Sequence, residues 1–464
     1  MSVKEQFSNQ LVSGNNYSEE EVKKYVEQGL AFYNDDEYAD AITCFTKVAE
    51  NNDVAQFYLG CCYTFGQGVE QDHDKGFSFL MKSAEQGNAD AQCYVGISYD
   101  LGIGVEQDYH EAVKWYKESV KGNVAQAQCK LGLCYDYGKG VEPNEEEAFK
   151  WYKKAAEQDF DYAQYYLSTC YALGKGVQPD IQEAVKWCRK AAEQNNAEAQ
   201  CQLGRCYITA QGVEKDCDEG LRWLKKAADQ YNIEACNLMG DIYRHGYGVE
   251  ADNETALQFY YQSAVQGDAE AEFRIGEYYE SENEGTPDEN AFEWYKKAAE
   301  QGLAKAQYNV ASCYEEGNGT EQSLELAFKW FALAAEQGYA EAQFMLGQFY
   351  EAGKGVEQNI EEAVRWLNAS SEQNCSFAQL HLAGLYAEGK GVEQSYEKAK
   401  ELFLQAAELG NPFAFYNLGY LYELGLGVGQ DYNEAFKWYK EAAEYGIADA
   451  DNKVAELKDC LKIE

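Results

Sequence analysis

Three of the chain's six arginines could form a binding site for a carboxylate. Arg205, Arg244 and Arg274 lie in three consecutive segments of a repeating pattern, at variable positions off its apolar face. A guanidinium can bind a carboxylate through two parallel hydrogen bonds. These arginines therefore suit a peptide terminus or an acidic segment of a partner.

Two further residues extend this basic cluster. His245 adjoins Arg244, and Lys130 occupies the slot of Arg274 four repeats earlier. The alternative is that the cluster only neutralises nearby acids, Asp241 and Glu277 included. Both interpretations stay open from the sequence.

Motifs that carry catalysis or bind metals are missing from the sequence. It contains no G-x-S-x-G, no phosphate-binding Walker loop, no H-E-x-x-H and no dinucleotide fingerprint. The four histidines are scattered over different repeats: His73, His110, His245 and His381. A recurring loop, V-E-Q-D, lacks the dense alternating acids of a calcium loop. We therefore expect no catalytic residue, metal, cofactor or small-molecule substrate, and predict that the chain is not an enzyme.

The cysteines recur at slots of the repeat rather than in pairs. Of fifteen cysteines, one slot holds Cys62, Cys134, Cys170, Cys206 and Cys313, and another holds Cys93, Cys129 and Cys201. Other repeats place Ser98, Ile242 or Phe349 at the first of these slots, which is typical of a small apolar filler. We expect buried, reduced thiols in an intracellular, cytoplasmic protein.

Composition excludes several classes of partner. The net charge of −41 argues against nucleic acid and against an anionic membrane surface, because both need clustered lysine and arginine. No apolar run is long enough to span a membrane, and the N-terminus lacks the pattern of a signal peptide. The acidity could attract basic partners, or it could simply keep a large surface soluble.

A motif with a fixed period must position all of these residues. The pattern A-Q-x-x-L-G-x-x-Y recurs eleven times, with a step of 36 residues everywhere except one step of 35 between Ala271 and Ala306. In one repeat Ala127, Leu131 and Tyr135 share a helix face, and a turn with Gly138 and Gly140 follows. The motif begins at Ala55, Ala91, Ala127, Ala163, Ala199, Ala235, Ala271, Ala306, Ala342, Ala378 and Ala414. Such a period is the signature of a solenoid.

A second helix follows each turn. Its predicted N-caps are Asp72, Asp108, Asn144, Asp180, Asp216, Asp252, Ser323, Asn359, Ser395 and Asp431. A glutamate three residues later predicts a reciprocal capping box at Glu111, Glu147, Glu183, Glu219, Glu362 and Glu434. All eight tryptophans share one slot of this helix, at core spacing, and we assign them to the core: Trp115, Trp151, Trp187, Trp223, Trp294, Trp330, Trp366 and Trp438.

A second candidate site is the slot two residues after each repeat alanine. It holds an aromatic residue in several repeats, including Tyr165, Phe273, Tyr308 and Phe344. If this slot is exposed, it would form an aromatic groove for a helix or an extended peptide. If it lies between stacked helices, it is ordinary packing between repeats.

One repeat departs from the pattern. Around residues 281–288 the double-glycine turn is lost and one residue is deleted, although Thr286, Pro287 and Glu289 still favour a helix start. This divergent unit, residues 271–305, could be a hinge that divides the array, or neutral drift of a surface turn.

The full repeat resembles the Sel-one-like repeat family, a relative of the tetratricopeptide repeat. The resemblance rests on A-x-A-Q-x-x-L-G-x-x-Y-x-x-G-x-G-V followed by D-x-x-E-A-x-x-W-Y-x-x-A-A-E-Q-G. It implies an all-α fold, a right-handed superhelical solenoid of tandem helix–turn–helix repeats. The expected organisation is a disordered N-terminus at 1–17, a tetratricopeptide-like unit at 18–54, eleven repeats at 55–448 and a capping helix at 449–464.

Members of that family are adaptors, so the resemblance implies a scaffold that binds proteins or peptides on the concave face formed by the first helices. A regulatory subunit that activates a bound enzyme is the alternative. Some secreted, cysteine-rich relatives are described as penicillin-binding or β-lactam-hydrolysing, but they pair cysteines within each repeat, and this chain shows no such pairing. That activity is the remote alternative.

Overall fold

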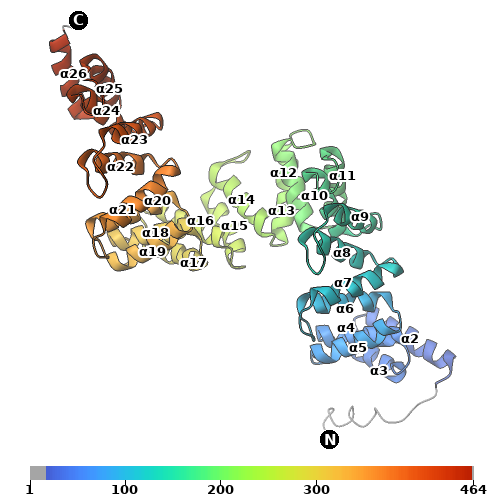
Figure 1. Ribbon diagram of the computed structural model, residues 1–464. Helices are drawn as coiled ribbons and strands as arrows, with labels where there is room; N and C mark the ends of the chain where they lie inside the picture. Colours follow the sequence, from blue (N-terminus) through green and yellow to red (C-terminus); the bar gives the residue numbers. More distant parts are fainter. Residues whose placement is uncertain (1–16, 462–464) are drawn as a thin grey trace. The chain divides into compact units, whose positions relative to one another are not determined.

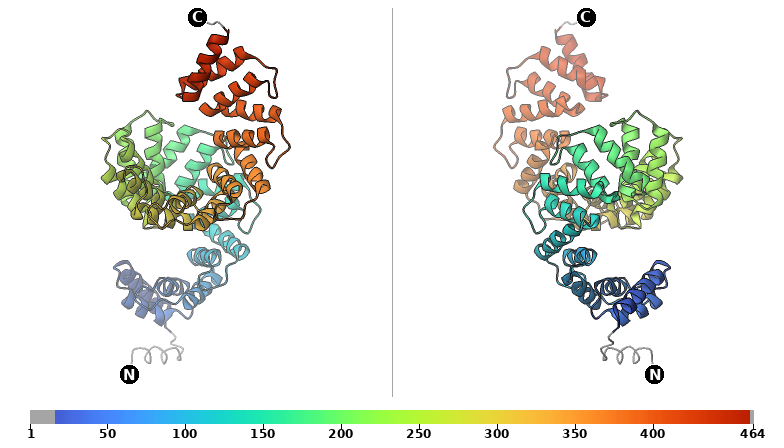
Figure 2. Two further views of the ribbon diagram at one scale, coloured as in Figure 1. Left: turned by 90° about the vertical axis from the view of Figure 1, so that its left-hand side faces the viewer. Right: turned by 90° about the vertical axis from the view of Figure 1, so that its right-hand side faces the viewer.

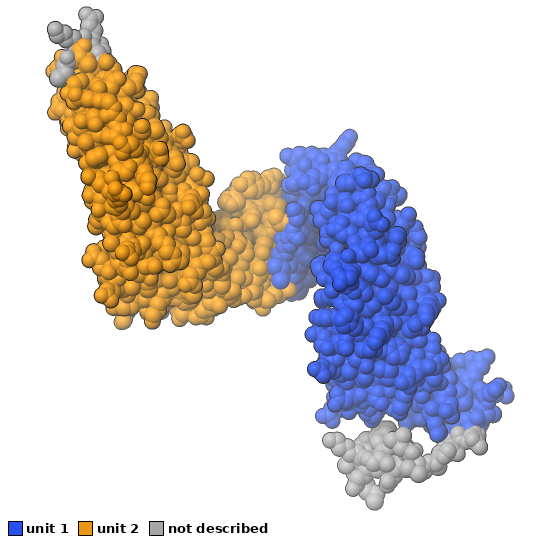
Figure 3. Space-filling model, viewed as in Figure 1, with its two compact units in different colours: residues 1–235 blue, residues 236–464 orange. Residues whose placement is uncertain are grey.

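The computed structural model describes residues 17–461, and in this range it is built of α-helices. There are twenty-five α-helices and one short 3-10 helix, and no strand occurs among the described residues. The chain divides into two compact units, residues 1–235 and 236–464 (Figure 3). Within residues 17–461, none of the helices combines the length and the apolarity needed to cross a membrane.

Helices that follow one another in the chain pack in pairs, as α8 does with α9 and α16 with α17 (Figure 1). The first helices of the eleven repeats are α4 (Asp53–Phe65), α6 (Ala89–Leu101), α8 (Ala125–Tyr137), α10 (Asp161–Leu173), α12 (Ala197–Thr209), α14 (Ile233–His245), α16 (Ala269–Glu282), α18 (Ala304–Glu316), α20 (Ala340–Ala352), α22 (Ser376–Glu388) and α24 (Pro412–Leu424). The second helices are α5 (His73–Glu85), α7 (Tyr109–Ser119), α9 (Glu145–Ala156), α11 (Ile181–Glu193), α13 (Cys217–Asp229), α15 (Asn253–Ala264), α17 (Glu289–Glu300), α19 (Leu324–Glu336), α21 (Ile360–Glu372), α23 (Tyr396–Glu408) and α25 (Tyr432–Glu444). The 3-10 helix η1 (Val120–Gly122) extends α7.

Three further helices flank the repeats, two before the first repeat and one after the last. The predicted tetratricopeptide-like unit forms α2 (Glu19–Asn34) and α3 (Tyr38–Val48), and the predicted C-terminal helix is α26 (Ala448–Leu461). The predictions for residues 1–16 and 462–464 lie outside the described residues. Figure 2 shows the paired helices from two further sides.

The second helices begin at the predicted caps. The side-chain oxygen of Asn144 accepts a hydrogen bond from the backbone N–H of Glu147 at 3.0 Å, which satisfies one free donor of the first turn of α9. All ten predicted caps accept such a bond. In the divergent repeat Asp288 does the same through the N–H of Ala291.

The predicted capping boxes are wrong in one of their two hydrogen bonds, the one from the N–H of the cap residue to the glutamate. A capping box needs the N–H of the cap residue to donate to the glutamate. In α9 the N–H of Asn144 donates instead to the carbonyl of Tyr135, at 2.9 Å, on the preceding first helix. Glu147 is therefore left to pair with Lys150 at 2.8 Å. The other predicted box glutamates, Glu111, Glu183, Glu219, Glu362 and Glu434, each pair with the lysine or arginine three residues later.

Close packing of the two helices in a repeat depends on glycine. Gly132 on α8 faces the buried ring of Tyr152 on α9, and a Cβ at Gly132 would lie 2.7 Å from that ring. In the turn, Gly140 has a φ of +69°, and a Cβ there would lie 2.1 Å from the carbonyl oxygen of Tyr109 in the preceding repeat. Glycine is thus required both within repeats and between them.

The tryptophans are less buried than the sequence predicts. Only Trp223, at 8% exposure, is buried, and the other seven are half-buried. Each packs against the cluster formed by its own first helix and the second helix of the preceding repeat, as Trp151 does on the cluster around Tyr116 and Leu131. In four repeats a lysine one turn later lies over the tryptophan ring, as Lys154 does with its Nζ 4.1 Å from the Trp151 ring centroid. The slot therefore joins repeats, and the fully buried slot is the next one, which holds Tyr116 or Tyr152.

The divergent repeat keeps its helix pair by extending the first helix. α16 runs to Glu282, and Glu284 and Gly285 take positive φ before the cap at Asp288. The boundary between the compact units falls at residues 235 and 236, one repeat earlier than this turn. The helices α16 and α17 lie wholly in the second unit.

Candidate interaction surface

The outward side of the first helices holds the residues that vary most between repeats. In α6 the outward positions hold Tyr94, Ile97 and Leu101, whereas the corresponding positions of α16 hold Arg274, Glu277 and Ser281. By contrast, the slot of the repeat alanine, which faces the core, holds alanine in every repeat, and all of these alanines are fully buried. This surface is the candidate site, and its chemistry differs between the two units.

Of the three arginines in the basic cluster, the one in the first unit, Arg205, already has an acidic partner. Arg205 on α12 forms an ion pair with Glu234 on α14. Lys130 on α8, which the sequence groups with this arginine, is half-buried and forms no ion pair with any residue in the described part of the chain.

In the second unit, two arginines share a network of carboxylates. Arg244 lies 2.7 Å from Glu277, and Arg274 lies 3.1 Å from the same Glu277. Arg274 also reaches Glu270 at 3.3 Å and Asp241 at 3.8 Å. Burial lowers the pKa of Arg244 and of Arg274, but the hydrogen bond to Glu277 and the nearby negative charges together outweigh it, so the net shift of each pKa is upward. The neutralisation by Asp241 and Glu277 is thus present, and a partner carboxylate would have to replace it.

His245 takes no part in that network. It is exposed at the end of α14, with its ring centroid 5.3 Å from the ring of Tyr247. The structure therefore brings Arg244 and Arg274 together and leaves His245 apart from them.

The aromatic slot lies between helices rather than on an open groove. Phe273 is buried at 6% exposure, and Tyr165, Tyr308 and Phe344 are half-buried. Tyr308 contacts Phe331 and Tyr339, each at 5.5 Å between ring centroids. These aromatic residues pack on clusters of buried residues that extend into the following repeat. Their side chains therefore contact neighbouring helices.

Sequence reasoning missed a row of exposed apolar residues in the first unit. Each is the last residue of a first helix, directly before the turn glycine: Phe65, Leu101, Tyr137 and Leu173. Their exposed fractions are 54%, 57%, 63% and 66%. The slot could have been found by aligning the repeats and asking which apolar residues lie off the core face.

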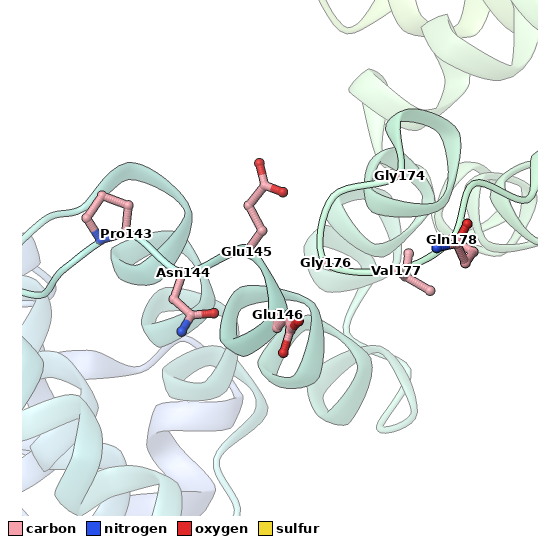
Figure 4. Close-up of a pocket in the computed structure, with 8 residues that line it drawn as sticks. All are labelled: Pro143, Asn144, Glu145, Glu146, Gly174, Gly176, Val177 and Gln178. Atoms are coloured by element: carbon pink, nitrogen blue, oxygen red, sulfur yellow. The ribbon is translucent and has the colours of Figure 1, made fainter.

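Shallow depressions occur among the described residues. One lies between consecutive turns in the first unit, with Asn144, Glu145 and Glu146 on the α9 side and Gly176 and Val177 opposite (Figure 4). The cap bond already occupies the Asn144 oxygen. Another depression, in the second unit, adjoins the divergent turn at Thr286 and Pro287.

Most of the cysteine thiols are buried. Fourteen cysteines in the described residues form no disulfide, and all but Cys217 and Cys375 are buried. Burial raises the pKa of Cys129 and of Cys170 to about 12, which disfavours the nucleophilic thiolate. No group of three or more potential metal ligands occurs in the part of the chain that the structure describes.

The chain is similar to a known family of repeat proteins and to solved structures of repeat proteins. The model of the Sel1 repeat matches eleven segments between residues 53 and 446. A crystal structure of a protective antigen from uropathogenic Escherichia coli, described as displaying an SLR fold, is 34% identical. The alignment covers 90% of this chain and 90% of that one, with a TM-score of 0.70.

A second solved structure is shorter. A Sel1 repeat protein from Oxalobacter formigenes is 33% identical over 52% of this chain and 96% of that chain, with a TM-score of 0.49. A search of curated proteins gave no match.

Proposed function

Because this chain belongs to the Sel1 repeat family, we propose that it is a scaffold that binds other proteins through the outward side of its first helices. One observation carries the proposal. Along the eleven repeats the repeat alanine of the core is always kept and buried, while the outward positions of the first helices differ, from Tyr94, Ile97 and Leu101 on α6 to Arg274, Glu277 and Ser281 on α16. A solenoid uses such positions to choose partners, since each repeat contacts only its neighbours and its outward residues are free to differ.

The basic cluster is part of this surface in the proposal. Arg205, Arg244 and Arg274 would exchange their present carboxylates for those of a partner, at a cost that limits affinity. Lys130, with no ion pair among the described residues, needs no such exchange.

Site-specific photo-crosslinking of the full chain tests the proposal. A crosslinking residue is placed at an outward position of a first helix, Leu133 or Gln348, or at an exposed position of a second helix, Lys117 or Lys329. We expect partner adducts from the first-helix positions only. Adducts from the second-helix positions, or none from any, would overturn it.

An Arg205/Arg244/Arg274→Glu triple variant tests the basic cluster separately. If it retains every crosslinked partner, the cluster does not select partners. A partner that is an enzyme should then be assayed with and without this chain, because an increase in its activity would favour a regulatory subunit over a passive scaffold.

A further inference from the structure

The row of exposed apolar residues in the first unit recurs at one slot of four consecutive repeats. Phe65, Leu101, Tyr137 and Leu173, here called the apolar row, each end a first helix and expose more than half of the side chain. Scattered exposed apolar residues are normal on proteins. A row that returns with the period of the solenoid is different, because stacking brings its members onto one edge of the array.

The fold does not require apolar residues at this slot. Five other repeats place exposed polar residues there, and two hold Ala352 and Leu424. The polar residues are Thr209, His245, Ser281, Glu316 and Glu388. The first helices α12, α16, α18 and α22 pair with their second helices as those of the first four repeats do. Pairing of the two helices therefore does not depend on the apolar row, and each exposed member costs solubility unless something covers it.

Aromatic rings on the same helices lie beside the row. Phe65 lies 6.3 Å from Tyr94, between ring centroids, in an edge-to-face contact. Tyr94 in turn contacts Phe57 at 5.5 Å, and Phe57 contacts Tyr58 at 5.1 Å. The surface next to the row thus offers ring faces as well as aliphatic groups.

The charge on these helices is negative. On α4, α6, α8 and α10 the acidic residues are Asp53, Asp90, Asp100, Asp136 and Asp161, against a single basic residue, Lys130. Asp90 is exposed and forms no ion pair within the described residues. Its charge raises the pKa of Tyr94, although burial of Tyr94 is the larger cause of that shift. A free carboxylate therefore lies close to the aromatic side chains.

We propose that the apolar row binds a basic segment of a partner polypeptide that also carries apolar side chains. This inference rests on the proposed scaffold function and names the partner class for its first unit. Apolar side chains of the partner cover the row, its lysines or arginines pair with Asp90 and Asp100, and a cation can lie over the ring of Tyr94 or Tyr137. A nucleic acid or an anionic membrane would be repelled by the same carboxylates.

Three matched synthetic peptides serve as probes against the full chain in fluorescence anisotropy. One alternates leucine with lysine and arginine on an amphipathic pattern, a second replaces its basic residues with glutamate, and a third replaces its leucines with serine. We expect the first to bind, with an affinity that falls as salt rises, and the other two to bind at least about tenfold more weakly. No binding of the first peptide, or equal binding of all three, would overturn the proposal.

A double variant, Leu101→Ser with Leu173→Ser, places the binding on the row. Both residues are exposed, so circular dichroism should match the parent chain. We expect the affinity of the basic peptide to fall about tenfold or more. The matched control is Val265→Ser in the second unit, at 76% exposure, which should leave the affinity unchanged. Equal loss in both variants, or loss in neither, would contradict the assignment.

Different experimental results would contradict the scaffold proposal and the proposal for the apolar row. If a partner still crosslinks to the first helices of the Leu101→Ser and Leu173→Ser variant at the parent level, the scaffold proposal stands and the apolar row is not its site. If no first-helix position of the parent chain gives an adduct, the scaffold proposal itself is wrong.

Discussion

The side-chain amide of Gln230 donates a hydrogen bond to the side-chain oxygen of Gln200 at 2.8 Å. Gln200 is buried on α12, and its own amide donates to the carbonyl of Ala192 on α11 at 3.1 Å. One glutamine pair thus joins three successive helices. The same pair recurs in Gln86 with Gln56, Gln158 with Gln128, Gln194 with Gln164, Gln337 with Gln307, and Gln373 with Gln343.

The tenth repeat lacks the donor of this pair, and Leu409→Gln should restore it. Gln379 is buried, and its side-chain oxygen has no hydrogen-bond partner, because the position of the donor is held by the half-exposed Leu409. We expect the substitution to stabilise α22 and α23 by about 1 kcal/mol. Hydrogen exchange resolved by segment measures this, since repeats open locally. Unchanged protection would show that water already satisfies Gln379.

The reverse substitution, Gln230→Leu, is the control for that prediction. It leaves the oxygen of Gln200 buried without its donor and should destabilise α12 and α13 by about 1–3 kcal/mol. A neutral result would mean that the glutamine pair contributes little to stability.

Glu272→Gln should stabilise the divergent repeat, in a manner that depends on pH. Glu272 replaces the buried glutamine of this slot and accepts a hydrogen bond from Gln301 at 2.7 Å. Burial raises its pKa above the usual 4.5, although the bond from Gln301 opposes this. A carboxyl with a raised pKa in the folded state favours folding when protonated, and loses that contribution as the pH rises from its unfolded pKa through its folded one.

The stabilisation by Glu272→Gln should therefore be small below pH 4.5, grow as the pH rises, and level off once Glu272 is ionised. Urea midpoints of the two chains across pH measure the difference. A constant difference from acid to neutral pH would contradict the raised pKa.

Removal of a cap should cost more than removal of the glutamate that follows it. Asn144→Ala leaves first-turn N–H groups of α9 without an acceptor and should cost about 1 kcal/mol. Glu147→Ala removes an exposed pair with Lys150 and should cost clearly less, because the N–H of Asn144 keeps its bond to Tyr135. Thermal denaturation compares the two. Equal losses would favour the reciprocal capping box that the sequence predicts.

Thiol titration should separate this chain from the secreted, disulfide-bonded relatives. We expect all fifteen cysteines to react in denaturant without reductant. In the native protein Cys217 and Cys375 should react first, because the other cysteines with described side chains are buried. A count well below fifteen in denaturant would revive the disulfide-bonded class and with it the β-lactam activity. The cytoplasmic location stays a prediction.

Much of the architecture was predictable because it depends on local chemistry. The period of the alanine motif predicts the helix pairs. Asn144 caps α9 because its amide oxygen lies within hydrogen-bond reach of the free N–H three residues later. Gly140 needs a positive φ wherever the turn is placed. Each of these requirements is met within a few residues of the chain.

What the tertiary structure decided involves groups that come from different helices. The sequence does not reveal that Tyr135 competes with Glu147 for one N–H, or that Gln230 meets Gln200. Burial likewise depends on which repeat lies above, so Trp151 is half-covered and Tyr152 is fully buried, though both lie on the apolar stripe. The same stacking pairs Arg244 with Glu277 and leaves Leu101 in solvent, and neither outcome follows from the sequence.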